Sequence, residues 1–233
     1  MKGRKMTRYR VKICKSPEWR RHRAATLGVS VTSQNCQGEK FAAILAFAAA
    51  HFETIRIGVT DALYRHNFMA EGAAQPEARA QADALGAIWL ARHQNIIDGC
   101  QVKPRVVRWA EWYAHSDYTE VMEGFQQAYR ASRTLREAVD ADVSKFYQRQ
   151  GRKPSSMEFD HRRDFPLEEA AVLTLQARAL PGLRIYPGTE LQSLRLMRAG
   201  LVPEAPRGLE QEQFARVQFE TRKIAAKPRA SFG

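Results

Sequence analysis

Cysteine is scarce in this chain of 233 residues: Cys14, Cys36 and Cys100 are widely spaced and none lies in a CxxC pair. An odd number at this spacing predicts neither a disulfide framework nor a zinc site. Apolar runs are too short to span a membrane, and the first residues are charged where a signal peptide needs an apolar stretch. We therefore expect a cytoplasmic protein without a membrane span or a bound metal ion.

Standard catalytic signatures are missing as well. The chain has no GxxxxGK[ST] phosphate loop, no GxGxxG after a strand, no HExxH and no GxSxG elbow. Its histidines lack metal-ligand spacing, and none is an evident partner for a serine nucleophile. ATP-driven activation and a Ser-His-Asp hydrolase are therefore not expected.

Acidic residues are outnumbered by basic ones. Lys and Arg total 37 against 25 Asp and Glu, and the net charge of +12 favours a polyanionic partner. Much of the excess lies in a basic N-terminal arm, residues 1–23, with ten Lys or Arg and one acid. Such an arm lies along phosphates, lies on a membrane surface or is a solvated tail, and charge alone leaves these alternatives open.

Short apolar or β-branched runs alternate with helical patterns, which indicates an α/β fold with a mostly parallel sheet flanked by helices. The expected strands are Tyr9–Cys14, Thr26–Val31, Ile55–Val59, Arg105–Trp109 and Leu183–Tyr186. The expected helices include Lys40–Phe52, Pro76–Ile97, two within Ser116–Gln150, and Leu167–Ala179. Gly151–Arg163 is expected to be a loop and residues 204–233 to be loosely ordered, with one domain over residues 1–233.

A candidate nucleophile lies where the second strand ends. Ser30 follows Gly28 by two residues, and the carboxyl ends of parallel strands border the crevice where such sheets bind ligands. Tyr186 ends another strand and would lie at the same edge. Of the adjacent Glu168 and Glu169, only one can easily point inward from a helix. Taken singly, these residues also fit a turn serine, a core tyrosine and acids at a helix N-terminus.

Three motifs follow one another in a fixed order: Gly28-Val29-Ser30, Asp61-Ala-Leu-Tyr-Arg-His-Asn67 after a strand, and Tyr186-Pro187. Over roughly residues 24 to 200, this order resembles the tRNA-dependent cyclodipeptide synthases. The resemblance implies a single Rossmann-like domain similar to the catalytic domains of class I aminoacyl-tRNA synthetases, without an ATP site. The missing phosphate-binding motifs agree with that.

The resemblance also implies a covalent, ping-pong reaction. Ser30 would accept the aminoacyl group of one charged tRNA as an ester, and a second aminoacyl-tRNA would extend it to a dipeptidyl ester. The free amine of that dipeptide would then release a cyclic dipeptide, a diketopiperazine typical of secondary metabolism. Glu169 would hold the amine and assist proton transfer, with Tyr118 and Tyr186 as further catalytic residues. Neither ATP nor a metal nor another cofactor is implied.

Substrate-binding residues follow from the same resemblance. The family pattern Tyr-x-x-x-Glu reads Phe165-Pro-Leu-Glu-Glu169 here, so the ring remains and the hydroxyl that helps bind the amine is lost. Ser33 and Pro187, beside Tyr186, resemble the XYP subfamily rather than NYQ. The remaining candidates are small residues that would border the pocket of the first amino acid, namely Thr26, Gly28 and Gly58.

Aminoacyl-tRNA is the expected partner, and the arm is the expected contact. Pro76–Ile97, where related proteins often carry a basic patch, has only Arg79 and Arg92. The tRNA-binding candidates are Lys2, Arg4, Lys5, Arg8, Arg10, Arg20, Arg21 and Arg23. Such contacts weaken steeply with salt. We expect a monomer without a stable protein partner.

Two other functions stay open. A different aminoacyl-tRNA-dependent acyltransferase would pass the group to a small amine or a peptide, with Phe165 marking the changed second step. An inactive tRNA-binding homologue is the non-enzymatic alternative, and the retention of Ser30 and Glu169 argues against it.

Overall fold

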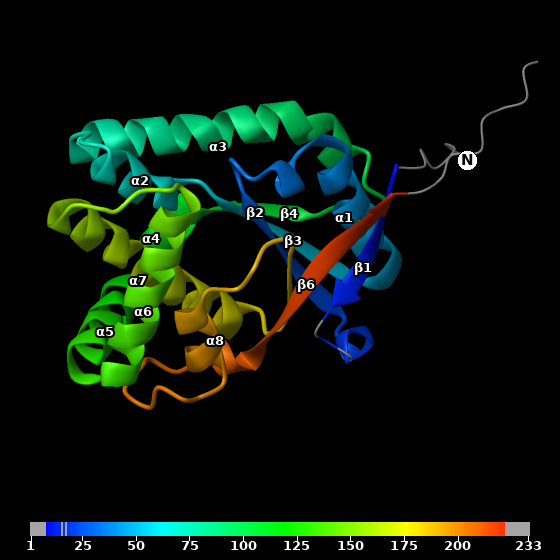
Figure 1. Cartoon of the computed structure of the whole chain (residues 1–233). Helices are drawn as coiled ribbons and strands as arrows, with labels where there is room; N and C mark the ends of the chain where they lie inside the picture. Colours follow the sequence, from blue (N-terminus) through cyan, green and yellow to red (C-terminus); the bar gives the residue numbers. More distant parts are fainter. Residues whose placement is uncertain (1–7, 15, 17, 222–233) are drawn as a thin grey trace, which may run out of the picture.

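The computed structural model describes residues 8–14, 16 and 18–221, which contain a six-stranded sheet of order β1-β6-β5-β2-β3-β4 (Figure 1). Strands β2 to β6 run parallel, and β1 pairs antiparallel with β6. The strands are β1 (Tyr9–Cys14), β2 (Ala24–Ser30), β3 (Thr54–Thr60), β4 (Arg105–Arg108), β5 (Gly182–Tyr186) and β6 (Glu212–Thr221). The predicted α/β class with a mostly parallel sheet is confirmed.

Helices cover both faces of the sheet (Figure 1). They are α1 (Gly38–His51), α2 (Arg65–Ala70), α3 (Gln75–Asp98), α4 (Trp109–Tyr113), α5 (Tyr118–Ala131), α6 (Arg133–Arg149), α7 (Ser156–Ala179) and α8 (Gln192–Arg198). One hydrophobic cluster joins α1 and part of α3 to the sheet, and a second joins α7 to α4, α5 and α8. The first cluster packs directly on the sheet, whereas the second lies mainly among the helices and takes Val107 from the strands.

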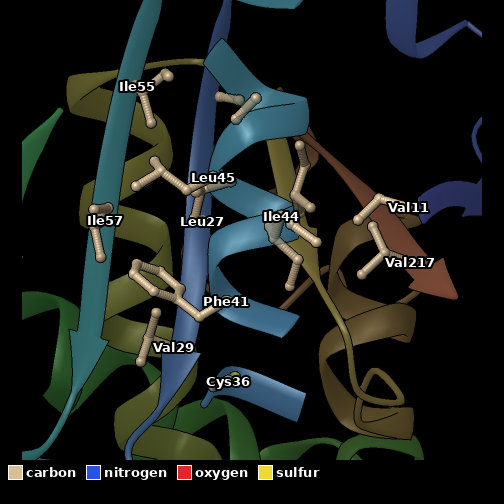
Figure 2. Close-up of a cluster of buried hydrophobic side chains, with 14 of the residues drawn as sticks. Val11, Leu27, Val29, Cys36, Phe41, Ile44, Leu45, Ile55, Ile57 and Val217 are labelled. Atoms are coloured by element: carbon tan, nitrogen blue, oxygen red, sulfur yellow. The ribbon is translucent and has the colours of Figure 1, made fainter. Parts of the chain in front are cut away.

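Strand alternation decides which residues reach which layer. Leu27 and Val29 pack against Phe41 and Leu45 of α1, a helix that is apolar nearly all round (Figure 2). Because side chains alternate along a strand, Thr26, Gly28 and Ser30 belong to the opposite face, the side of α7. This alternation delivers Ser30 to the helical layer that carries the two glutamates.

Helix α7 begins earlier than the sequence predicts. The expected loop Gly151–Arg163 is wrong from residue 156 onward, because Ser155 accepts a hydrogen bond from the Glu158 amide while the Glu158 carboxylate accepts one from the Ser155 amide. This capping box starts the helix, and Pro166 lies inside it. The helix therefore carries both glutamates in its interior rather than in its first turn.

Strand β6 is the second difference. Residues 204–233 were expected to be loosely ordered, which is wrong for Glu212–Thr221, while residues 222–233 lie outside the described residues. Ala215 and Val217 are buried, and β6 is held between β5 and β1. Small or apolar residues alternate with polar ones over 215–219, which is the pattern of a strand. The many Pro, Lys and Arg residues after Gly200 make this pattern hard to recognise in the sequence.

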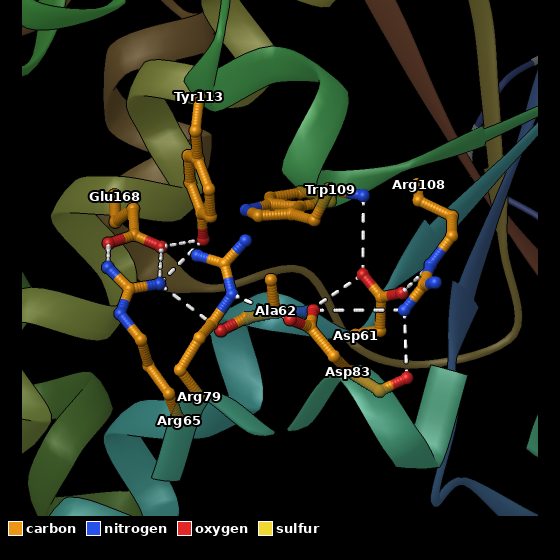
Figure 3. A network of polar contacts seen from close by, with 9 residues as sticks. All are labelled: Asp61, Ala62, Arg65, Arg79, Asp83, Arg108, Trp109, Tyr113 and Glu168. Atoms are coloured by element: carbon orange, nitrogen blue, oxygen red, sulfur yellow. Dashed lines mark hydrogen bonds and ion pairs between the residues drawn. The ribbon is translucent and has the colours of Figure 1, made fainter. Parts of the chain in front are cut away.

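A buried carboxylate joins β3, β4 and α3. Asp61 is fully buried, accepts a hydrogen bond from the Ala62 amide at 2.7 Å and pairs with Arg108 Nε at 2.5 Å (Figure 3). Arg108 also donates to the carbonyl of Asp83 on α3, at 2.8 Å. Gly86, one turn further along α3, lies so close to Asp61 that no Cβ fits there. The helix can dock on the ion pair only through a glycine.

We therefore expect Gly86→Ala to destabilise the fold. Helix propensity alone would favour alanine by about 1 kcal/mol. The added methyl would overlap an Asp61 carboxylate that cannot move without breaking its pair, and overpacking of that kind costs roughly 2–4 kcal/mol. Urea unfolding measures the net effect. Ala87→Gly, at an exposed neighbour, is the control and should cost only about 1 kcal/mol. A stabilised Gly86→Ala protein would show that α3 is not docked this closely.

Candidate active site

Ser30 ends β2 with its hydroxyl bonded to a tyrosine. Its Oγ lies 2.7 Å from Tyr64 Oη, and Thr32 also hydrogen-bonds that phenol. The phenol of Tyr186, at the end of the neighbouring β5, also lies beside Ser30. Burial raises the pKa of Tyr186, and a hydrogen bond with Ser30 acts in the opposite direction. The partners of the candidate nucleophile are phenols rather than an imidazole. Tyr64 was not among the sequence candidates, although it lies in the motif Asp61–Asn67.

A cavity of about 290 Å³ opens beside Ser30; we call it the Ser30 cavity. It is lined by five residues that the sequence nominated, namely Ser30, Ser33, Phe165, Glu169 and Tyr186. The lining also includes residues that the sequence did not nominate, among them Thr60, Tyr64, Arg149, Arg184, Glu190 and Arg198. The structure therefore brings together chain segments that lie far apart in the sequence.

Glu168 belongs to a separate, buried ion cluster. Arg65 Nη1 donates to Glu168 Oε1 at 2.7 Å, and Arg65 Nη2 also contacts Glu168. Tyr113 donates to the same carboxylate (Figure 3). His66 Nε2 also lies 3.0 Å from it. These partners lower the pKa of Glu168 despite its burial. The side chain is a charged anchor between α7 and α2.

Glu169, the next residue, turns toward the Ser30 cavity. Burial raises its pKa to about 7, and the nearby Arg184 and Arg162 act in the opposite direction. At that value the carboxyl group can accept and return a proton near neutral pH. The expectation that Glu169 points into the site while Glu168 points elsewhere agrees with this placement.

Phe165 lines the cavity one turn before Glu169, and its ring makes a cation–π contact with Arg162. The Arg162 guanidinium lies 4.2 Å from the centre of the Phe165 ring and 3.6 Å from that of Phe146. Arg162 is buried, and desolvation lowers its pKa to about 10. The ring that lacks a phenol hydroxyl thus supports a positive charge close to Glu169.

A possible rival nucleophile is disfavoured by its surroundings. Cys36 follows Ser30 in the turn after β2 and is 1% exposed. Burial raises the pKa of the Cys36 thiol to about 11, so little thiolate forms near neutral pH. Ser30 is the better placed of the two groups for attack on a ligand in the cavity.

Other sequence candidates lie outside the cavity lining. Tyr118 packs against Tyr113 with ring centres 5.1 Å apart, beside the Glu168 cluster rather than Glu169. Pro187 is buried between two lining residues, Tyr186 and Gly188. Thr26, Gly28 and Gly58 share the sheet face beneath the cavity, where Gly28 is paired with Gly58.

The basic arm is divided between two edges of the sheet. Arg8 and Arg10 are exposed at the start of β1, which pairs with the carboxyl end of β6. Arg20, Arg21 and Arg23 are exposed before β2, at the opposite edge from Ser30, a strand length of about 20 Å away. Lys2, Arg4 and Lys5 lie outside the described residues. Arg21 and Arg23 are also paired with Glu18 and Glu53, at 2.9 and 3.9 Å.

Within residues 8–14, 16 and 18–221, no group of three or more His, Cys, Asp or Glu side chains is arranged to hold a metal ion. None of the helices in this part of the chain is long and apolar enough to cross a membrane.

The two adjacent glutamates should respond oppositely to neutralisation. Glu168→Gln removes the charge that balances Arg65, and we expect it to lower the free energy of unfolding by roughly 2–3 kcal/mol at pH 8. Glu169 is costly when ionised, because its pKa in the folded state lies above that of the unfolded chain. We therefore expect Glu169→Gln to raise the free energy of unfolding by roughly 1–3 kcal/mol at pH 8.

Urea unfolding at pH 8 and pH 5 separates the two effects. The gain from Glu169→Gln should shrink as the pH falls through about 7 toward the ordinary carboxyl value, because the wild-type side chain becomes neutral in the folded protein. The loss from Glu168→Gln should persist at pH 5, since the pKa of Glu168 is lowered. Equal destabilisation by both variants would assign Glu169 a structural role.

Comparison with known proteins identifies the family of this chain. A family model described as cyclodipeptide synthase matches residues 11–165, more than half of the chain. No curated protein sequence matches. A cyclodipeptide synthase structure from Fluoribacter dumoffii is 21% identical with a TM-score of 0.82, covering 92% of this chain and 99% of that one.

Two further structures extend the comparison. The cyclodipeptide synthase from Candidatus Glomeribacter gigasporarum bound to Phe-tRNAPhe is 16% identical with a TM-score of 0.65, covering 90% of this chain and 92% of that one. Tyrosyl-tRNA synthetase from Archaeoglobus fulgidus, complexed with L-tyrosine, is 16% identical with a TM-score of 0.51, covering 84% of this chain and 54% of that one. At these identities the similarity concerns the fold, which is thus shared with a tRNA synthetase. The match to the family model shows that this chain belongs to the cyclodipeptide synthase family.

Proposed function

We propose that this protein makes a cyclic dipeptide from two aminoacyl-tRNAs, with Ser30 as the covalent acceptor. The observation that carries the proposal is the Ser30 cavity, in which a hydroxyl nucleophile, two phenols and a carboxyl group of pKa about 7 meet inside the fold of this family. The charged tRNA ester supplies the driving force, so the residues need only position the reactants and move protons.

In the first step, Ser30 Oγ attacks the ester carbonyl of one aminoacyl-tRNA. A bond forms between Oγ and the carbonyl carbon, the bond to the terminal ribose oxygen breaks, and the serine proton passes to that oxygen. The phenols of Tyr64 and Tyr186 are placed to relay this proton, because both lie beside Ser30 and line the cavity. Ser30 then carries the aminoacyl group as an ester.

In the second step, the amine of the Ser30-bound group attacks the ester carbonyl of a second aminoacyl-tRNA. The second tRNA leaves, and a dipeptidyl ester stays on Ser30. The terminal amine of the dipeptide then attacks the Ser30 ester, which closes the ring and returns the hydroxyl. Each attack needs a neutral amine, and Glu169 is placed to take the proton from the ammonium group.

Basic groups beside the cavity fit a tRNA acceptor end. The lining of a neighbouring cavity of about 300 Å³ has three cations, Lys145, Arg149 and Arg195, and two acids, Asp142 and Glu190. Arg149 lines both cavities. Phosphates passing along α6 and α8 toward Ser30 would meet these cations. We infer that this groove supplements Arg8 and Arg10, which lie at the same sheet edge as Ser30.

Residues that separate the subfamilies fit the XYP type. Ser33 lines the cavity, while Pro187 follows Tyr186. Phe165, which brings no hydroxyl into the cavity, leaves a second candidate function, in which the aminoacyl group passes from Ser30 to an acceptor other than tRNA. Expression in a bacterium followed by mass spectrometry of the culture medium tests this: new diketopiperazines support the main proposal, and their absence together with a linear aminoacyl product supports the second.

Ser30→Ala should abolish the covalent intermediate. We expect wild-type protein incubated with aminoacyl-tRNA to gain the mass of one aminoacyl group, located at Ser30 by peptide mass spectrometry. The variant should gain none and still bind tRNA, because the hydroxyl is lost without a change in charge. Cys36→Ala, the control, should retain the adduct. An adduct of undiminished amount on the Ser30→Ala protein would place the nucleophile elsewhere.

Cyclisation should depend on pH through Glu169. Because Glu169 acts as a base with a pKa of about 7, the rate of cyclic dipeptide formation should fall about tenfold per unit as the pH drops below 7. Glu169→Gln should slow the rate by roughly 100-fold and remove this dependence. Single-turnover assays with preformed aminoacyl-enzyme measure it. A rate that rises on acidification would identify Glu169 as an acid instead.

A further inference from the structure

A buried arginine forms part of the cavity wall next to Ser30. Arg184 on β5 is 5% exposed overall, yet it lines the Ser30 cavity. Its guanidinium bends toward Gly28, since an added Cβ there would lie 3.3 Å from Arg184 Nη2. The glycine leaves room for this charged group on the same sheet face as the candidate nucleophile. Ser30 is two residues beyond Gly28, a distance of about 7 Å along the strand.

The guanidinium of Arg184 is only partly compensated. Its Nη1 donates to the neutral Gln176 side chain at 3.0 Å, and the carboxylate of Glu212 lies 4.0 Å away. Glu169 is near enough for the two charges to interact, but it makes no hydrogen bond with Arg184. Glu212 is shared with Arg198, which lies at 3.2 Å and also pairs with Glu190 at 2.9 Å. Glu190 and Glu212 therefore both lie closer to Arg198 than Glu212 lies to Arg184.

A second cation lies behind the first. Arg56 on β3 is 7% exposed and paired in register with Thr26, which is paired in turn with Arg184. Among the described residues, Arg56 Nη1 and Gln176 Nε2 are buried donors without a hydrogen-bond partner. Buried donors are normally satisfied, and buried cations normally have an acid apiece. Within the described residues, this part of the site therefore holds two unpaired buried donors and an arginine, Arg184, without a carboxylate at hydrogen-bond distance.

The geometry points to an acidic amino acid as the first substrate: Ser30 receives an aspartyl or glutamyl group whose side-chain carboxylate binds Arg184. This rests on the proposed function and specifies its substrate. With the α-amine at Glu169 and the ester at Ser30, a side chain directed along β2 toward Gly28 meets the guanidinium. Because Arg184 Nη2 lies against Gly28, only two strand residues from Ser30, the short side chain of an aspartyl or glutamyl ester is of the right scale to reach it. A planar guanidinium binds a carboxylate through two parallel hydrogen bonds.

The other charges of the cavity agree with this choice. Arg149 adds positive charge to the lining, while Arg198 and Glu190 form an ion pair with each other. In the proposed reaction, Glu169 binds the α-amine of the substrate rather than its side chain. A lysyl or arginyl side chain would meet Arg184 with like charge, and a leucyl side chain would leave the guanidinium desolvated without a partner.

The test holds the tRNA constant and changes only the amino acid. One tRNA is chemically charged with glutamate, glutamine or leucine, and formation of the Ser30 ester on the full-length protein is followed by intact mass. We expect glutamyl transfer to exceed glutaminyl transfer at least about 10-fold and leucyl transfer by more. Glutamine is the matched probe, because it keeps the shape of glutamate and removes the charge.

Arg184→Gln should remove the preference. Glutamyl transfer should fall roughly 30-fold or more, while glutaminyl and leucyl transfer stay within a few-fold of the wild-type rates. Arg184→Lys keeps the charge and should retain a preference for glutamate over glutamine. Arg133→Gln, which removes an exposed arginine of α6, is the control and should behave as wild type. Thermal unfolding and tRNA binding show whether each variant is folded.

Two outcomes would overturn the inference. One is a wild-type protein that transfers leucine as fast as glutamate. The other is a folded Arg184→Gln protein that loses all three transfers equally, which would make Arg184 a structural residue. These results leave the proposed function standing as long as some aminoacyl-tRNA forms the Ser30 ester. Failure of a full set of charged tRNAs to form any ester would instead reject the proposed function itself.

Discussion

The buried contact between Glu168 on α7 and Arg65 on α2 sets the rotation of α7 on the sheet. Successive helical residues diverge by about 100°, so fixing Glu168 in its cluster turns Glu169 toward the Ser30 cavity. Burying such a pair gains little free energy on balance, because desolvation offsets much of the attraction. Its value here is positional. Tyr113 and His66 also hydrogen-bond the Glu168 carboxylate. All of these hydrogen bonds can form in only one orientation of α7.

The sheet supplies the other half of the site through its register. Gly28 and Gly58 are paired on adjacent strands and point toward α7, so the face lacks two side chains side by side. Beyond them Ser30 lies at the carboxyl edge, and behind them Arg184 extends into the freed space. A parallel sheet of larger residues would be filled at this level. At Gly28, the space that a side chain would take is occupied by Arg184 and Tyr186, so the glycine lets both of them approach β2 below Ser30.

The sequence predicts those site residues that a local pattern, or the order of motifs shared with the family, can identify. Alternation and strand ends located Ser30 and Tyr186, while the choice of Glu169 over Glu168 came from the resemblance. Tyr64 and Arg184 were missed as site residues because their importance depends on which segments become neighbours, which no local pattern records. Strand β6 was missed for a related reason: its charged residues are compensated from other elements, as Glu212 is by Arg198. The start of α7 has a local signal in the sequence, the Ser-x-x-Glu capping box of Ser155 and Glu158, but the polar composition of the segment around it is that of a loop.

Unbalanced groups in the site are evidence about what it binds. Arg56 and Gln176 keep buried donors unpaired, and each such donor costs about 1–3 kcal/mol of stability. Glu169 is held in a place that disfavours its charged form. A fold optimised for stability alone would replace these groups by apolar ones of similar size. In the proposed reaction, the amine of the substrate would meet the Glu169 carboxyl group, and a substrate carboxylate would meet the guanidinium of Arg184. An acidic aminoacyl ester, the substrate that we infer, carries both of these groups.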